Sequence, residues 1–137
     1  MRRPALAAVA VDITALVLFV IIGRASHDHG ETLAGFASTC WPFAVGLVAG
    51  ETAAGRLASG RPLSARAGAV VTVSTVAVGM VLRVVAGQGT AVAFIVVALV
   101  FLGGAMTAGR AALRWMAGRL APASERHREG PGRPLRS

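Results

Sequence analysis

Apolar residues along this chain gather in four long segments, and most of the charged residues fall between or after them. The segments cover about residues 4–23, 33–55, 67–86 and 90–109, and the last of them contains no charged residue. An α-helix of about 20 residues rises about 30 Å, which is the thickness of the hydrocarbon core of a bilayer. The pattern therefore predicts four transmembrane helices.

Composition supports a membrane protein without a soluble catalytic domain. Of the 137 residues, 55% are hydrophobic and 15% are charged, whereas a typical soluble domain is about one quarter charged. Four crossings use about 80 residues, which leaves no room for a second domain. No general base, nucleophile and orienting group stand together in a catalytic pattern. We expect an all-α integral membrane bundle that is not an enzyme and has no cofactor and no metal.

The arginines predict how the bundle is oriented. All 14 basic residues are arginine; two precede the first helix, three lie in the middle loop and seven lie from Arg110 onward. The first loop holds only Arg24 and the third loop holds none. Because positively charged loops stay in the cytoplasm, we expect a multi-pass protein of the cytoplasmic (inner) cell membrane with both termini inside.

The chain changes character after the transmembrane domain, which we place at residues 1–110. Residues 111–121 mix arginines with apolar side chains, which predicts a short basic interfacial extension on anionic lipid headgroups at the inner face. Residues 122–137 have no apolar period and are expected to be disordered. The net charge of +8 does not indicate nucleic acid, because the arginines form no stripe with interleaved aromatic residues.

Small residues recur at helical spacing along the first three segments. Helices in lipid associate through close backbone approach, so Gly46, Gly50 and Gly79 are predicted packing positions. Such faces could also bind a second copy of the chain or another membrane protein. Pro42 removes one backbone hydrogen bond within the second helix and frees a carbonyl near Ser38 and Thr39.

Asp12 is the most informative single residue, because a carboxylate near the middle of a bilayer is costly and is often functional. One interpretation is a proton or cation site. The other is a polar tie that holds the first helix against Thr72, Thr75 or a backbone carbonyl. Asp12 is predicted to lie about 13 Å in depth from Arg83, which is too far for direct pairing.

Two further ionisable residues lie within the segments. Glu51 stands within two turns of Arg56, so an ion pair between them near the inner edge is the favoured interpretation, with a functional intramembrane carboxylate as the alternative. Arg83 is expected to extend to the outer surface as an anchor. Alternatively it pairs with Asp28 or Glu31 of the first outer loop.

That loop places Arg24, His27, Asp28 and His29 close together. Histidines two residues apart can share a metal ion, but no third histidine or cysteine is nearby. A solvated, pH-responsive loop is the favoured interpretation, and metal binding is left open.

Several residues together resemble a known family. The chain has an aspartate in helix one, Gly23-Arg24-x-Ser26-His27 after it, and Trp41-Pro42-Phe43 with Gly46 in helix two. Gly79-x-x-x-Arg83 and Thr90-x-x-x-Phe94 follow. Over about residues 9–110 this resembles the bacterial four-helix membrane proteins filed as domain of unknown function 3054. The resemblance implies four membrane helices and supplies no activity, cofactor or catalytic residue.

Two function classes follow from the sequence. The first is a small transporter or channel-like subunit that uses Asp12. The length and the helix-one carboxylate are similar to those of small multidrug exporters, but the strong arginine bias argues against their dual topology. The alternative is a structural or assembly subunit of a membrane complex, with no transport or catalytic activity, whose small-residue faces bind the partner.

Overall fold

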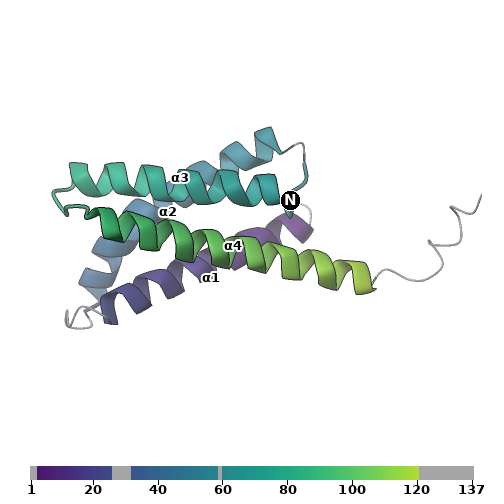
Figure 1. The fold of residues 1–137 in the computed structure, drawn as a ribbon, viewed down its shortest axis with the longest axis horizontal. Coiled ribbons are helices and arrows are strands. Elements are labelled where there is room, and N and C mark those ends of the chain that lie inside the picture. Colours follow the sequence, from purple (N-terminus) through teal and green to yellow (C-terminus); the bar gives the residue numbers. More distant parts are fainter. Residues whose placement is uncertain (1–2, 26–31, 59, 121–137) are drawn as a thin grey trace, which may run out of the picture.

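Four long helices make up the bundle, seen in a computed structural model that describes residues 3–25, 32–58 and 60–120 (Figure 1). They are α1 (Arg3–Ala25), α2 (Leu33–Leu57), α3 (Ala65–Val85) and α4 (Val92–Leu120). Each is long and apolar enough to cross a membrane. The described residues contain no strand, so the predicted all-α bundle of four membrane helices is confirmed.

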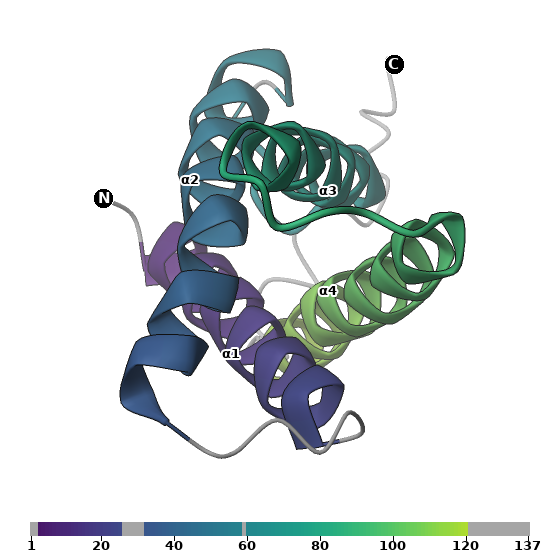
Figure 2. The same cartoon turned by 90° about the vertical axis from the view of Figure 1, so that its left-hand side faces the viewer.

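The helices form a ring in chain order. The most extensive interface joins α2 to α3, and α1 closes the ring by packing against both α2 and α4 (Figure 2). One end of the bundle holds the start of α1, the α2–α3 connection and the end of α4 (Figure 1), and we call it the Arg61 end. The other end holds the end of α1, the start of α2 and the α3–α4 connection, and we call it the Arg83 end.

Local signals explain where the helices begin and turn. The Thr32 hydroxyl accepts a hydrogen bond from the Gly35 amide at 3.1 Å, and Ser64 accepts one from the Ala67 amide at 3.1 Å. These side chains satisfy amides that the first turn leaves unpaired. Between α3 and α4, Gly87 and Gly89 both have φ of +69°, a conformation that glycine adopts without steric cost. The antiparallel turn therefore needs few residues.

Close contact between α2 and α3 depends on two glycines. A Cβ atom on Gly46 would lie 2.6 Å from the Thr75 carbonyl oxygen, and one on Gly50 would lie 2.9 Å from the Val71 carbonyl oxygen. Gly79 of α3 faces the ring of Phe43, which is fully buried. Glycine therefore lets the two backbones approach more closely than any side chain would allow.

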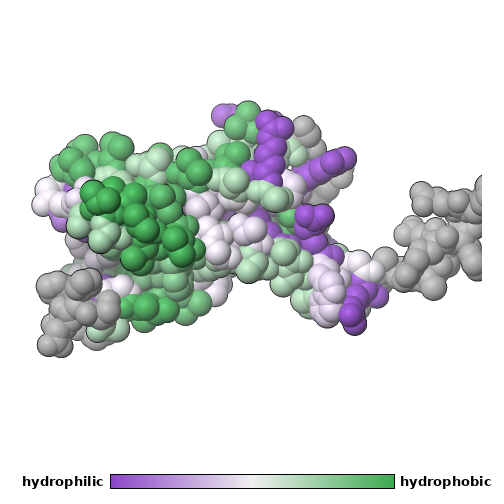
Figure 3. All heavy atoms as spheres, in the orientation of Figure 1, coloured by the Kyte–Doolittle hydropathy of each residue, from purple (hydrophilic) through white to green (hydrophobic). Residues whose placement is uncertain are grey.

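The core is aromatic and the outside is apolar. Phe19 packs edge-on against Phe43, with ring centroids 5.6 Å apart, and also contacts Phe94 and Phe101. Figure 3 shows strongly hydrophobic residues over the Arg83 half of the visible face, residues of intermediate hydropathy in its middle, and hydrophilic residues concentrated toward the Arg61 end. Large apolar side chains that point outward include Leu33, Val48, Val73, Val85, Val92 and Val100. Such a surface suits lipid contact.

The end of α4 reaches beyond its uncharged stretch. The helix continues without a break to Leu120, so the described part of the expected basic extension is the last part of the same helix. Trp115 is 60% exposed, and the Arg119 guanidinium lies 3.9 Å from the centre of its ring. The tail at residues 122–137 lies outside the described residues.

Candidate functional site

Arg110 of α4 is the centre of a buried ionic cluster. Its side chain is 2% exposed, and its Nη2 contacts both Asp12 Oδ2 of α1 and Glu51 Oε1 of α2, the latter at 2.7 Å. Its Nη1 donates to the carbonyl oxygen of Pro62 in the α2–α3 connection. One guanidinium thus joins three elements to its own helix.

Small residues make room for this arginine. A Cβ atom on Gly109 would collide with the side chain of Val11, so glycine at this position brings α4 close to α1 beside Asp12. On α3, a Cβ atom on Gly68 would lie 3.4 Å from Arg110 Cδ. The aliphatic stem of Arg110 therefore passes directly over α3 before its charged end reaches the carboxylates.

The cluster has more negative than positive charge. Asp12 is fully buried and the Glu51 side chain is 22% exposed. With both carboxyl groups ionised, two negative charges share one guanidinium. Among the described residues, Asp12 Oδ1 has no hydrogen-bond partner and neither does Arg110 Nε. A net charge in an apolar interior is costly, so the cluster favours a further cation or a proton.

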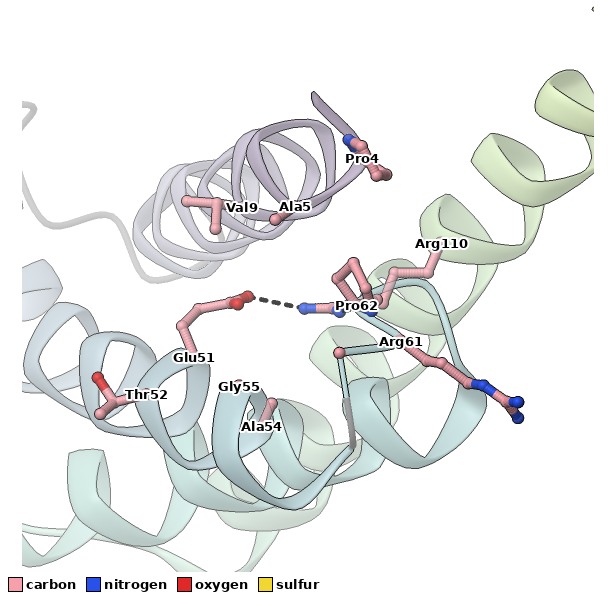
Figure 4. Close-up of a pocket in the computed structure, with 11 residues that line it drawn as sticks. Pro4, Ala5, Val9, Glu51, Thr52, Ala54, Gly55, Arg61, Pro62 and Arg110 are labelled. Carbon is pink, nitrogen blue, oxygen red and sulfur yellow. Dashed lines mark hydrogen bonds and ion pairs between the residues drawn. The ribbon is translucent and has the colours of Figure 1, made fainter. Parts of the chain in front are cut away.

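A cavity of about 490 Å³ opens beside the cluster at the Arg61 end. Glu51 and Arg110 line it together with apolar side chains from α1, and Figure 4 shows the Glu51 carboxylate directed toward the Arg110 guanidinium. The Arg61 side chain starts at the same cavity but directs its guanidinium away from Glu51 (Figure 4). The cavity has the size of a small-molecule site.

The structure changes the expected partners of Asp12 and Glu51. Asp12 bonds to neither threonine of α3, because the Thr75 hydroxyl donates to the Val71 carbonyl at 2.7 Å and the Thr72 hydroxyl to Met106 Sδ at 3.6 Å. Glu51 pairs with Arg110, whereas Arg56 is exposed. The interpretation of Glu51 and Arg56 as an ion pair was therefore wrong.

Sequence reasoning assigned Arg110 to the topology count and missed it as a buried partner. A signal was present, because Gly103 and Met106 lie seven and four residues before Arg110 on one helical face. Met106 and Arg110 are both buried. A basic residue that continues a small, buried face is a candidate for an internal ion pair.

At the Arg83 end, Arg83 is held by neutral groups. Its Nη1 donates to Gln88 Oε1 at 3.1 Å, its Nη2 donates to the Gly89 carbonyl at 3.4 Å, and its guanidinium lies 4.9 Å from the centre of the Phe94 ring. Asp12 forms its ion pair with Arg110 and not with Arg83. The expected alternatives Asp28 and Glu31 lie outside the described residues, and so do His27 and His29.

Gln88 also explains how α2 accommodates Pro42. The amide Nε2 of Gln88 donates to the Ser38 carbonyl at 3.0 Å. Ser38 is four residues before Pro42, so this is the carbonyl that proline deprives of its helical partner. A side chain from the α3–α4 turn therefore replaces the missing backbone bond.

Four membrane-length helices around a buried ionic cluster define a small multi-pass integral membrane protein. A family model described as protein of unknown function (DUF3054) matches residues 9–113, and the chain belongs to that family. The matched region contains Asp12, Glu51, Arg83 and Arg110. No curated protein and no solved structure matches the chain.

Proposed function

We propose that this protein is a small membrane transport subunit that binds a proton or a small cation at Glu51. The observation that carries the proposal is that Glu51 shares the single guanidinium of Arg110 with Asp12 while lining an open cavity. Intramembrane ionisable groups commonly mark ion and proton pathways.

The carboxylates of Asp12 and Glu51 differ in their access to the cavity. Asp12 is fully buried beneath Arg110 and does not line the cavity, whereas Glu51 is partly exposed within it. We therefore assign the exchange of the proton or cation to Glu51. Asp12 supplies a fixed negative charge that compensates the positive charge of Arg110. The negative charge of Glu51 is then not compensated within the cluster. In this assignment Asp12 acts indirectly, which differs from a direct role for Asp12 in transport.

The position of the cavity indicates the side of the membrane with which Glu51 exchanges its proton or cation. It lies at the Arg61 end, together with the start of α1 and the α2–α3 connection. The arginine bias predicts that this end is cytoplasmic. The proton or cation at Glu51 would then exchange with the cytoplasm in the conformation described here, and transport would require a second conformation that opens toward the Arg83 end.

The alternative function, an assembly subunit, has less support from the contacts. It requires small-residue faces that are available to a partner. Gly46 and Gly50, which form the clearest such pair in the sequence, are covered by the backbone of α3 within the same chain. Co-purification of one defined membrane protein in a fixed ratio, without any ion flux, would favour this alternative.

Proton flux into proteoliposomes tests the proposal. The purified chain is reconstituted with an entrapped pH-sensitive dye, and a potassium gradient with valinomycin imposes a membrane potential. We expect faster acidification than in protein-free vesicles. Glu51→Gln and Asp12→Asn should each reduce it to background, because either change leaves one carboxylate for one guanidinium.

Thr52→Val is the matched control. Thr52 also lines the cavity, but its hydroxyl donates to the Val48 carbonyl of its own helix and carries no charge. Flux should therefore persist in this variant. Wild-type vesicles that acidify no faster than protein-free vesicles, and that take up no radiolabelled tetramethylammonium under the same membrane potential, would overturn the proposal. Undiminished flux in Glu51→Gln would also overturn the assignment of Glu51.

A further inference from the structure

A second cavity, of about 340 Å³, lies at the Arg83 end, opposite the carboxylate cluster. Two arginines from different helices line it, Arg24 in the last turn of α1 and Arg83 in the last turn of α3. No acidic side chain is among the described residues that line it. The cavity at the Arg61 end, in contrast, has the carboxylate of Glu51 in its lining beside Arg61 and Arg110.

The groups that hold Arg83 fix the orientation of its side chain but do not neutralise its positive charge. Its two terminal nitrogens donate to an amide oxygen of Gln88 and a backbone carbonyl of Gly89. Its Nε is buried and has no acceptor among the described residues. Gln88 is itself fixed by its bond to the Ser38 carbonyl. A guanidinium held by neutral acceptors keeps its full charge for an anion.

Arg24 approaches the same space from the other side of the bundle. Its Nη1 donates to the Thr39 hydroxyl at 3.5 Å, and its guanidinium packs over Gly35, where a Cβ atom would lie 2.5 Å from Nη2. Glycine at position 35 therefore lets this side chain lie flat against α2. Arginine forks placed in this way suit the oxygens of a phosphate group.

Another part of the cavity lining is apolar. Phe19 and Val20 of α1 and Phe94 of α4 line it, and Phe19 and Val20 belong to the buried core. An occupant that fits both parts has an anionic head near the arginines and an apolar portion directed toward the phenylalanines. The helix-terminal position of both arginines places the anionic head at the depth of the lipid headgroups.

We infer that the cavity at the Arg83 end is a binding site for a phosphate group that carries an apolar or glycerol substituent, with Arg24 and Arg83 as its ligands. This chemistry has two sources, an anionic phospholipid of the surrounding leaflet or a soluble phosphate ester. The site is independent of the proposed exchange at Glu51, because it shares no residue with the Arg110 cluster.

Binding to the full-length chain in detergent tests the inference. Native mass spectrometry measures retention of phosphatidylglycerol relative to phosphatidylcholine, and calorimetric titration measures binding of glycerol 3-phosphate. Preferential retention of phosphatidylglycerol would identify a lipid, and binding of glycerol 3-phosphate without that preference would identify a soluble ester. Either result supports the site. A wild-type protein that shows neither would overturn it without reference to any variant.

Variants then assign the residues. Arg83→Gln and Arg24→Gln should each weaken binding of the preferred probe about tenfold or more, since each removes a charge-assisted hydrogen bond. Arg66→Gln is the matched control, because Arg66 is an exposed arginine at the other end of α3. Thermal unfolding confirms that each variant is folded. If Arg66→Gln weakens binding as much as Arg83→Gln does, overall positive charge explains the affinity and the assigned site is wrong.

Discussion

Arg110 forms an ion pair with Asp12, which lies 98 residues earlier in the chain, and both side chains are almost completely buried. The pair joins the last helix to the first. Because the Arg110 nitrogen that contacts Asp12 also contacts Glu51 of α2, the loss of this arginine would affect three helices together. The first prediction follows from this arrangement.

Arg110→Met should destabilise the protein by about 3–5 kcal/mol, because it leaves two carboxylates near each other without a cation. Unfolding in detergent, followed by circular dichroism, measures the change. The matched control is Arg114→Met, one turn further along α4, where the side chain is exposed. The double variant Asp12→Leu with Arg110→Met should recover part of the loss, since it removes a buried charge along with its partner. Equal stability of the two single variants would contradict the ion-pair interpretation.

Gly46→Ala should destabilise the α2–α3 interface by about 1–3 kcal/mol, the usual cost of adding atoms to a well-packed contact. The added Cβ atom would lie 2.6 Å from the Thr75 carbonyl oxygen, so the backbones must separate. Gly55→Ala serves as the control, because no atom lies within 4 Å of a Cβ atom at that position of the same helix. It should be neutral or slightly stabilising, since alanine favours a helix over glycine. A Gly46→Ala protein as stable as Gly55→Ala would mean that the helices are not in close contact.

Gln88→Leu should cost about 1 kcal/mol, because the Ser38 carbonyl loses the hydrogen bond that replaces the one removed by Pro42. In a Pro42→Ala background, the amide of residue 42 becomes available to the same carbonyl. The effect of Gln88→Leu on unfolding should then be smaller than in the wild type. A double-mutant cycle measured by thermal unfolding gives this difference directly. Strictly additive effects would show that Gln88 does not compensate for Pro42.

The arginine distribution predicts that both termini face the cytoplasm. Reporter fusions at Ser137 and at Gly60 should therefore read cytoplasmic, and a fusion at Gly30 should read external. Alkaline phosphatase and green fluorescent protein are suitable opposite reporters for the two sides. An external signal at Ser137 would reject this orientation and would also place the Glu51 cavity on the other side of the membrane.

The depth of Arg110 could not be read from the sequence. The sequence pattern ends the fourth apolar segment at Gly109, so Arg110 looked like the first residue at the headgroups. The helix in fact continues for ten more residues to Leu120, which corresponds to about 15 Å along its axis. A charged residue marks the end of an uncharged stretch, but the helix can continue past it. When such a residue has a buried partner of opposite charge, it can lie inside the bundle.

Arg83 illustrates the same limit. Its position in the last turn of the third helix was evident from the sequence. Its bonds to Gln88 and Gly89, and its position over the Phe94 ring, depend on the conformation of the α3–α4 turn. The directions of the Gln88 side chain and the Gly89 carbonyl depend on the backbone dihedral angles of the turn. The sequence alone therefore does not predict these contacts.

The sequence by itself determined the four membrane helices, because a bilayer requires about 20 consecutive apolar residues for each crossing and the chain supplies four such segments. It also singled out Asp12, since a carboxylate in such a segment is rare. Only the tertiary structure decided that Asp12 and Glu51 share Arg110. Ion pairs between helices depend on how the helices are rotated and how closely they approach, and these are set by packing at Gly46, Gly68 and Gly109 across the whole bundle.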